Sequence, residues 1–201
     1  MSGEAGMTND GMRNDEGNSS SREARGFTVI ELLVVVAIIV VLGGLVLGTA
    51  GYVQKKGKRS RAEAEIAAIS AALENYKADN GVYPSSAETN SLFPNSVGDP
   101  TDAKYRAASL ALYKMISGDA DNDPTRAAES KVYFPFKPNQ LDPTTQTQPV
   151  TFIKDPFGFS YGYSTVKSSA PSGSDGYNPT FDLWSTGGKA GPSQAQWIKN
   201  W

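Results

Sequence analysis

The side chains that could do chemistry in this sequence are carboxylates, lysines, serines and tyrosines, because cysteine and histidine are both absent. This composition excludes disulfide bonds, thiolate chemistry, histidine-based triads and zinc sites built from cysteine or histidine. No nucleophile–base pair, phosphate-binding glycine loop or metal triad stands out among the other residues, so we predict that the protein is not an enzyme. Nineteen basic and 21 acidic residues nearly cancel, and no nucleic-acid partner is expected.

The densest group of acids is the phrase "GDADNDPT" at residues 118–125. Asp119, Asp121 and Asp123 fall at positions 1, 3 and 5 of an EF-hand calcium loop. That motif also needs a glycine at position 6 and a glutamate at position 12, where this chain has Pro124 and Ser130. The phrase therefore fails the motif, and we predict a solvated acidic turn.

A single acid, Glu31, lies near the start of the apolar run at residues 27–51. A charge inside a bilayer costs about 2.5–3.5 kcal/mol on insertion scales, so it normally has a partner. If the chain were cut between Gly26 and Phe27, the new α-amine would be a cation at a similar depth. In a stack of such helices, Glu31 of one subunit could neutralise the amine of the next. Alternatively, Glu31 reaches the membrane surface or is protonated.

The elements that would position these acids follow from the hydropathy pattern. Residues 1–26 are polar and rich in glycine and serine, typical of a disordered leader. Residues 27–51, at about 1.5 Å per residue, could span about 37 Å, which exceeds a hydrocarbon core of roughly 30 Å. Residues 52–80 begin with the basic phrase "KKGKRSR" and continue with apolar residues three and four apart, which predicts an amphipathic helix. We therefore predict one helix of about fifty residues, ending at Asn80-Gly81.

Residues 81–201 have a different texture, with all twelve prolines of the chain and short segments between them. The phrase 109–118 predicts a short helix, and 137–149 a polar loop. Aromatic and β-branched content predicts strands in four phrases: "KVYFPF" (131–136), "VTFI" (150–153), "FSYGYSTV" (159–166) and "TFDLWS" (180–185). The fold class expected is α+β, a long N-terminal helix carrying a small, loop-rich antiparallel sheet.

The phrase "RGFTVIELLVVVAIIVVL" resembles the class III signal of type IV pilins and type II secretion pseudopilins. That pattern implies removal of the leader after Gly26 by a prepilin peptidase, methylation of the new N-terminal Phe27, and a role for Glu31 in filament assembly. The phrase "DNGVYP" at 79–84 extends the likeness to the end of the helix. Two competing interpretations are a secretory signal peptide cut after "GTA" at 48–50 and a plain single-span anchor.

The C-terminal third resembles the major pseudopilin of type II secretion systems, through "KDPFGFSYGYS" (154–164), "FDLWSTGGKAG" (181–191) and "WIKNW" (197–201). In that family a calcium ion pins the last loop, and the matching ligands here are Asp175, Asp182 and Ser185. Lys189 departs from the family pattern, which has an acidic residue in this loop, and a lysine there disfavours Ca²⁺. The stretch 95–150 is longer than such a domain requires and is interpreted as an insertion.

The function that this resemblance implies is a structural subunit of a type II secretion pseudopilus, which helps to export folded proteins across the outer membrane. The implied partners are copies of the chain joined through the N-terminal helix, the prepilin peptidase, other pseudopilins and the inner-membrane secretion platform. The chain would be single-pass in the inner membrane with its head in the periplasm, although the five basic residues in 55–61 would favour the cytoplasm by charge alone. A type IV or competence pilus subunit is the alternative, and a membrane-tethered binding or enzymatic domain is the alternative from another class.

Overall fold

The computed structural model describes residues 26–95, 98–188 and 194–201, without the side chains of residues 46–50. The chain divides into two compact units, residues 1–48 and 49–201. The predicted leader, residues 1–26, lies outside the described residues except for Gly26.

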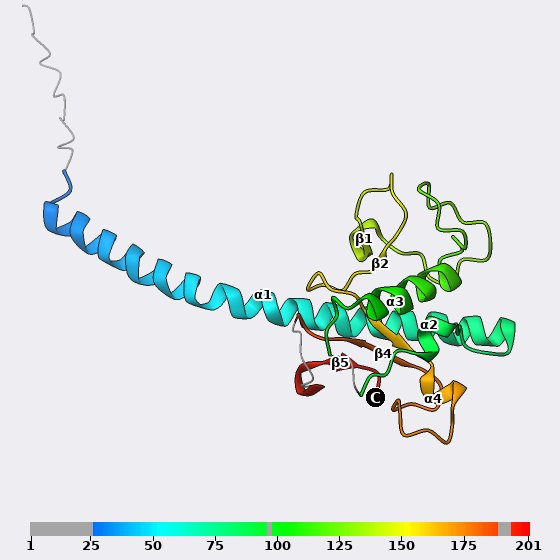
Figure 1. Cartoon of the computed structure of the whole chain (residues 1–201). Coiled ribbons are helices and arrows are strands. Elements are labelled where there is room, and N and C mark those ends of the chain that lie inside the picture. The colour runs from blue at the N-terminus through cyan, green and yellow to red at the C-terminus, as the bar shows by residue number, and fades with distance from the viewer. Residues whose placement is uncertain (1–25, 96–97, 189–193) are drawn as a thin grey trace, which may run out of the picture. The chain divides into compact units, whose positions relative to one another are not determined.

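A single helix, α1 (Val29–Asn80), is 52 residues long. Figure 1 draws it as the longest element of the chain's described residues. It ends where the sequence predicted, because Gly81 adopts φ = +79° and its N–H donates to the Lys77 carbonyl at 2.7 Å. This left-handed glycine is a common helix stop. Gly57 lies inside α1 without interrupting it. The prediction of one long N-terminal helix is confirmed.

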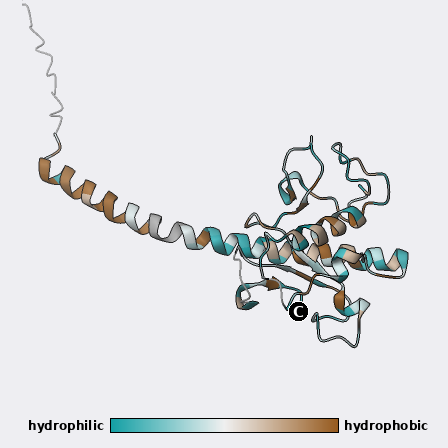
Figure 2. Ribbon diagram, in the orientation of Figure 1, coloured by the Kyte–Doolittle hydropathy of each residue, from teal (hydrophilic) through white to brown (hydrophobic). Residues whose placement is uncertain are grey.

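The part of α1 in the first unit is apolar apart from Glu31 and its glycines, and Figure 2 shows its first turns as mostly hydrophobic. The large apolar side chains between Val29 and Leu45 are 49–84 % exposed. Across the described residues, no helix combines the length and the apolar character that crossing a membrane requires.

In the second unit, one face of α1 enters the core. Ala62, Ile66, Ile69 and Leu73 recur at steps of four and three, and each is at most 5 % exposed. This spacing places them on one side of the helix, as the amphipathic pattern predicted. They belong to the same apolar cluster as buried residues of the sheets, including Tyr163.

Besides α1, the described residues of the second unit form three helices, five strands paired antiparallel, and two 3₁₀ turns. The helices are α2 (Ala87–Asn90), α3 (Ala103–Ile116) and α4 (Val166–Ser169); the turns are Pro138–Gln140 and Gln194–Gln196. The strands are β1 (Leu141–Asp142), β2 (Phe152–Ile153), β3 (Gly162–Ser164), β4 (Asp182–Ser185) and β5 (Ile198–Lys199). β1 pairs with β2, and a second sheet has the order β3-β4-β5. An α+β fold with small antiparallel sheets is therefore confirmed, and the predicted strand phrases at 150–153, 159–166 and 180–185 each contain a strand.

The fourth predicted strand, residues 131–136, is wrong, because this segment forms no strand. Tyr133 and Phe134 both donate their backbone N–H to the Ile116 carbonyl, at the end of α3, at 2.9 Å. These donors are therefore not free to pair with a neighbouring strand. Pro135 has no N–H to offer to a ladder. The aromatic rings instead pack on the core from a loop, with the Phe134 and Phe136 centroids 4.7 Å apart.

The helix predicted at 109–118 is present as α3, which begins six residues earlier, at Ala103. Asp102 caps it by accepting the Lys104 N–H at 2.8 Å. Tyr105, Leu112 and Ile116 on α3 are fully buried. The first part of the stretch 95–150, interpreted as an insertion, thus contributes to the core.

Candidate functional site

The predicted processing and assembly site lies at the start of α1. Gly26 is exposed and Phe27 is 82 % exposed, so both are accessible. Glu31 Oε2 accepts the Thr28 N–H at 2.9 Å and the Thr28 hydroxyl at 2.8 Å. In return, Thr28 Oγ1 accepts the Glu31 N–H at 3.2 Å. These reciprocal bonds form a capping box, which satisfies donors that the first turn of a helix otherwise leaves free.

Thr28 is a residue that the sequence argument missed. The signal was available, since a threonine followed three residues later by a glutamate before an apolar run predicts a capping box. The geometry gives Glu31 a partner within its own chain. The predicted partner in a neighbouring subunit remains a separate prediction, because a carboxylate oxygen that accepts two hydrogen bonds leaves the other oxygen available.

Asp182, the second predicted site residue, begins β4 and is 1 % exposed. Its Oδ2 accepts the Tyr177 N–H and its Oδ1 accepts the Asn178 N–H, both at 2.8 Å. Burial raises the pKa of this carboxyl, while the two backbone N–H groups act in the opposite direction. Asp182 thus fixes the loop before β4. Gly176 sits against it, with a built Cβ 3.3 Å from Asp182 Oδ2, and its φ of +80° also favours glycine.

Ser185, at the other end of β4, contacts a different carboxylate. Its hydroxyl is fully buried and donates to Asp155 Oδ2. Residues three apart on a strand point to opposite faces and lie about 10 Å apart, so Ser185 and Asp182 do not share one site. The structure brings together Ser185 and Asp155 instead.

Asp155, in the phrase "KDPFG", is the second residue that the sequence argument missed. It is 3 % exposed, and its Oδ1 accepts the N–H groups of Phe157 and Phe159, both at 2.9 Å. Burial raises its pKa, and the hydrogen bonds from Ser185 and the backbone lower it. An aspartate before proline commonly organises a turn through such bonds, which was a readable signal. Asp155 fastens this turn to the end of β4.

Asp175, the remaining predicted calcium ligand, is half-buried in the loop before Gly176. Lys189, which the sequence argument set against calcium, lies outside the described residues. Ca²⁺ takes six to eight oxygen ligands at about 2.3–2.6 Å. The Asp182 carboxylate already accepts two backbone N–H groups, and the Ser185 hydroxyl donates to Asp155. Calcium binding through Asp175 and Asp182 therefore stays a prediction.

The acidic phrase at 118–125 is only partly the solvated turn that was predicted. Asp121 is exposed, whereas Asp119 is 1 % exposed and accepts the Tyr113 hydroxyl at 2.7 Å and the Asn122 N–H at 2.8 Å. Asp119 is buried, and its hydrogen bond from Tyr113 connects the loop to α3. Ligand oxygens of Asp119, Asp121 and Asp123 lie within 4.8 Å of one another, the one such group of three or more among the described residues.

Comparison with known proteins matches two adjacent segments of the chain. Residues 21–47 match the family model described as "Prokaryotic N-terminal methylation motif". Residues 51–116 match the model described as "Type II secretion system (T2SS), protein G". No solved structure matches the chain.

Several curated relatives carry the description "Type II secretion system core protein G". That of Pectobacterium carotovorum is 40 % identical over 73 residues, covering 36 % of this chain and 46 % of the relative. Those of Pseudomonas aeruginosa and Escherichia coli are each 39 % identical, over 80 and 77 residues, covering 39 % and 38 % of this chain and 56 % and 51 % of the relatives. The chain spans about half the length of the curated relatives it matches. The resemblance to type IV pilin-like proteins and the type II secretion pseudopilin family is confirmed.

Proposed function

We propose that the chain is a structural subunit of a type II secretion pseudopilus. The observation that carries the proposal is the order of the two matches on one element. The methylation-motif match begins before α1 and runs into it, and the protein G match continues along the same helix and through α3. A filament subunit needs both parts: a processed N-terminal helix through which the subunits polymerise, and a head that packs against the heads of neighbouring subunits.

The proposed maturation is cleavage between Gly26 and Phe27 by a prepilin peptidase, followed by methylation of the Phe27 amine. The exposure of Phe27 supports access by the enzyme. The matured helix would then hold the chain in the inner membrane, with the head in the periplasm, until it polymerises. The apolar, exposed side chains of residues 29–45 support packing of this segment against lipid or against identical helices.

Mass spectrometry of the chain recovered from membranes tests the processing step. The expected N-terminus is methylated Phe27, whereas an intact leader or a start at Gly51 would contradict the proposal. Gly26→Val is the matched variant, since a built Cβ at Gly26 meets no atom of the chain within 4 Å. The substitution should leave the fold intact and block cleavage, so the variant should retain its leader.

Deletion of the gene separates a secretion pseudopilus from a type IV or competence pilus. For a pseudopilus, the deletion strain should retain folded enzymes in the periplasm while its surface pili and DNA uptake stay normal. Normal secretion with lost pili or lost DNA uptake would support the alternative instead. Complementation with the parent chain, but not with Gly26→Val, should restore secretion.

A further inference from the structure

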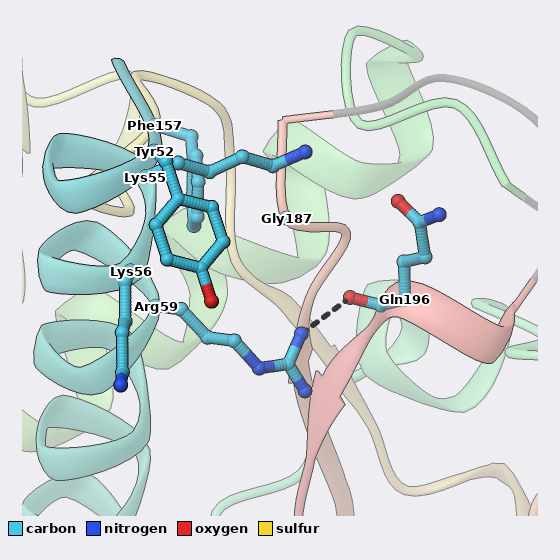
Figure 3. Close-up of a pocket in the computed structure, with 7 residues that line it drawn as sticks. All are labelled: Tyr52, Lys55, Lys56, Arg59, Phe157, Gly187 and Gln196. Carbon is cyan, nitrogen blue, oxygen red and sulfur yellow. Dashed lines mark hydrogen bonds between the residues drawn. The ribbon is translucent and has the colours of Figure 1, made fainter. Parts of the chain in front are cut away.

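The second unit contains a basic cavity that none of the roles above uses. It has a volume of about 470 Å³ and lies between α1 and the C-terminal segment. Tyr52, Lys55, Lys56 and Arg59 line it from α1, and their spacing of three and four residues places them on one helical face. Figure 3 shows Lys55 and Arg59 extending from α1 toward the segment that carries Gln196.

Two of the three cations in this cavity, Lys55 and Lys56, have no acidic partner among the described residues. Arg59 is held in place, with its Nε 3.2 Å from Glu63 and its Nη1 donating to the Gln196 carbonyl at 3.1 Å. Lys55 and Lys56 are exposed, and the described residues place no carboxylate within ion-pair distance of either. The cavity therefore favours an anion.

The remaining lining indicates which kind of anion. Phe157 and Tyr52 both line the cavity, so two aromatic side chains lie beside the cations. A ligand with a charged end and an apolar body fits such a lining better than a bare ion. Tyrosine and basic residues are also the types that gather where a chain leaves a bilayer.

The position of the cavity in the sequence indicates where that ligand comes from. Tyr52 follows the apolar run 27–51 directly. Basic segments next to a membrane attract acidic lipids, at about 1 kcal/mol per lysine or arginine near the surface. Five basic residues on the translocated side oppose the usual charge distribution, so their presence calls for a role on that side.

We propose that Lys55, Lys56 and Arg59 bind the phosphodiester headgroup of an acidic phospholipid in this cavity. The inference rests on the membrane anchoring proposed above, and it adds a lipid ligand that the pseudopilus role does not require. The bound headgroup would hold the base of the head at the membrane surface before the subunit is extracted into a filament.

Calorimetric titration of the full chain in a nonionic detergent tests this site. The ligands are dihexanoyl phosphatidylglycerol, dihexanoyl phosphatidylcholine and inorganic phosphate. The parent should bind phosphatidylglycerol at least about tenfold more tightly than either of the others, and raised salt should weaken that binding. Equal affinity for phosphatidylcholine would overturn the proposal, and equal affinity for inorganic phosphate would assign the cavity to a free anion and overturn the lipid.

The double variant Lys55→Gln, Lys56→Gln should bind phosphatidylglycerol about thirty-fold more weakly. The matched control is Lys104→Gln, Lys137→Gln, which removes the same charge from exposed positions elsewhere on the head and should bind like the parent. Equal melting temperatures of the three chains would show that folding is unaffected. Unchanged lipid binding by the Lys55, Lys56 variant would show that these residues do not bind the lipid and would contradict the proposal. A variant that loses self-association but keeps lipid binding would contradict it as well. Cleavage and methylation are not needed for binding, so this result is independent of the pseudopilus test.

Discussion

At the scale of single residues, two carboxylates close turns through local hydrogen bonds. Glu31 closes the first turn of α1 with Thr28, and Asp155 closes the turn before β3 with backbone N–H groups. Each acid therefore has a structural role that a variant must be designed to separate from any functional one.

Glu31→Ala and Glu31→Gln should both be inserted and cleaved normally but assemble poorly. Both remove the charge that would neutralise the N-terminal amine of the next subunit in a filament. Glutamine still fits the N3 position of a capping box, so it separates the charge from the cap. Filament yield after shearing or cross-linking is the measurement. Normal assembly of Glu31→Gln alone would assign the effect to the cap. Normal assembly of both variants would contradict the pairing with a neighbouring amine and support a Glu31 that reaches the membrane surface.

The pH dependence of the free energy of unfolding should reveal the raised pKa of Asp155. Because its pKa is raised in the folded chain, the native state keeps this proton to a higher pH than the unfolded state, whose value is about 3.9. The stability that this group contributes is complete below that pH and is lost as pH rises through the raised pKa. Relative to Asp155→Asn, the parent should thus lose free energy of unfolding as pH increases above about 4.

Urea unfolding at several pH values measures this difference. The matched control is Asp99→Asn, because the hydroxyl and N–H of Thr101 lower the pKa of the exposed Asp99. Its contribution is present at higher pH and is lost as pH falls, so the control difference should have the opposite sign. Parallel profiles for the parent and Asp155→Asn would contradict the account of a buried, titrating turn acid.

At the scale of elements, the core depends on the buried face of α1. Leu73 is fully buried in the main cluster, whereas Asn75, two residues along, is exposed. Leu73→Ala should lower the free energy of unfolding by about 2–5 kcal/mol through lost burial and the cavity it leaves.

The control for that variant is Asn75→Ala, which should change stability by less than about 0.5 kcal/mol because it removes no buried group. Thermal or urea unfolding of both variants checks the pair. Equal effects would mean that this face of α1 is not part of the cooperative core.

The elements that the sequence predicted are those specified by local patterns. The length of α1 follows from its apolar run, its helical spacing and the Asn80-Gly81 stop, all of which are contiguous in the chain. The segment 131–136 had the composition of a strand but no partner, because its N–H groups bond to the end of α3. Pairing is a long-range property that composition does not encode.

The same distinction separates the two candidate sites. Glu31 was identified because one acid in an apolar run is anomalous by itself. The partner of Ser185 was not, because Asp155 is thirty residues away in the sequence. Burial of Asp119 was missed although its partner Tyr113 is only six residues away, because an acidic phrase by itself predicts exposure.

At the scale of the whole molecule, the effect of calcium on thermal stability tests whether an ion or side-chain packing holds the C-terminal loop in place. A ligand that binds only the folded state adds about 2.7 kcal/mol at a hundred times its dissociation constant. If Asp175 and Asp182 bind Ca²⁺, the full chain in detergent should melt at a higher temperature in millimolar calcium than in chelator.

Two variants locate that effect. Asp182→Ala should abolish the calcium-dependent shift, whereas Asp121→Ala with Asp123→Ala should leave it unchanged. A shift that survives the first variant and disappears in the second would place calcium at the acidic phrase 118–125 instead. Coincident curves for the parent with and without calcium would mean that packing alone holds the loop.

The tryptophans of the head have an optical consequence. All three in the chain, Trp184, Trp197 and Trp201, lie in one cluster, with the rings of Trp184 and Trp197 stacked at 5.7 Å and 6°. Gly162 permits this arrangement, since a Cβ there would lie 2.3 Å from the Trp184 ring. Intrinsic fluorescence and near-ultraviolet circular dichroism of the indoles therefore report on one place, the docking of β5 and the C-terminal residues against β4. Changes confined to the apolar part of α1, which contains no tryptophan, should be nearly silent in both signals.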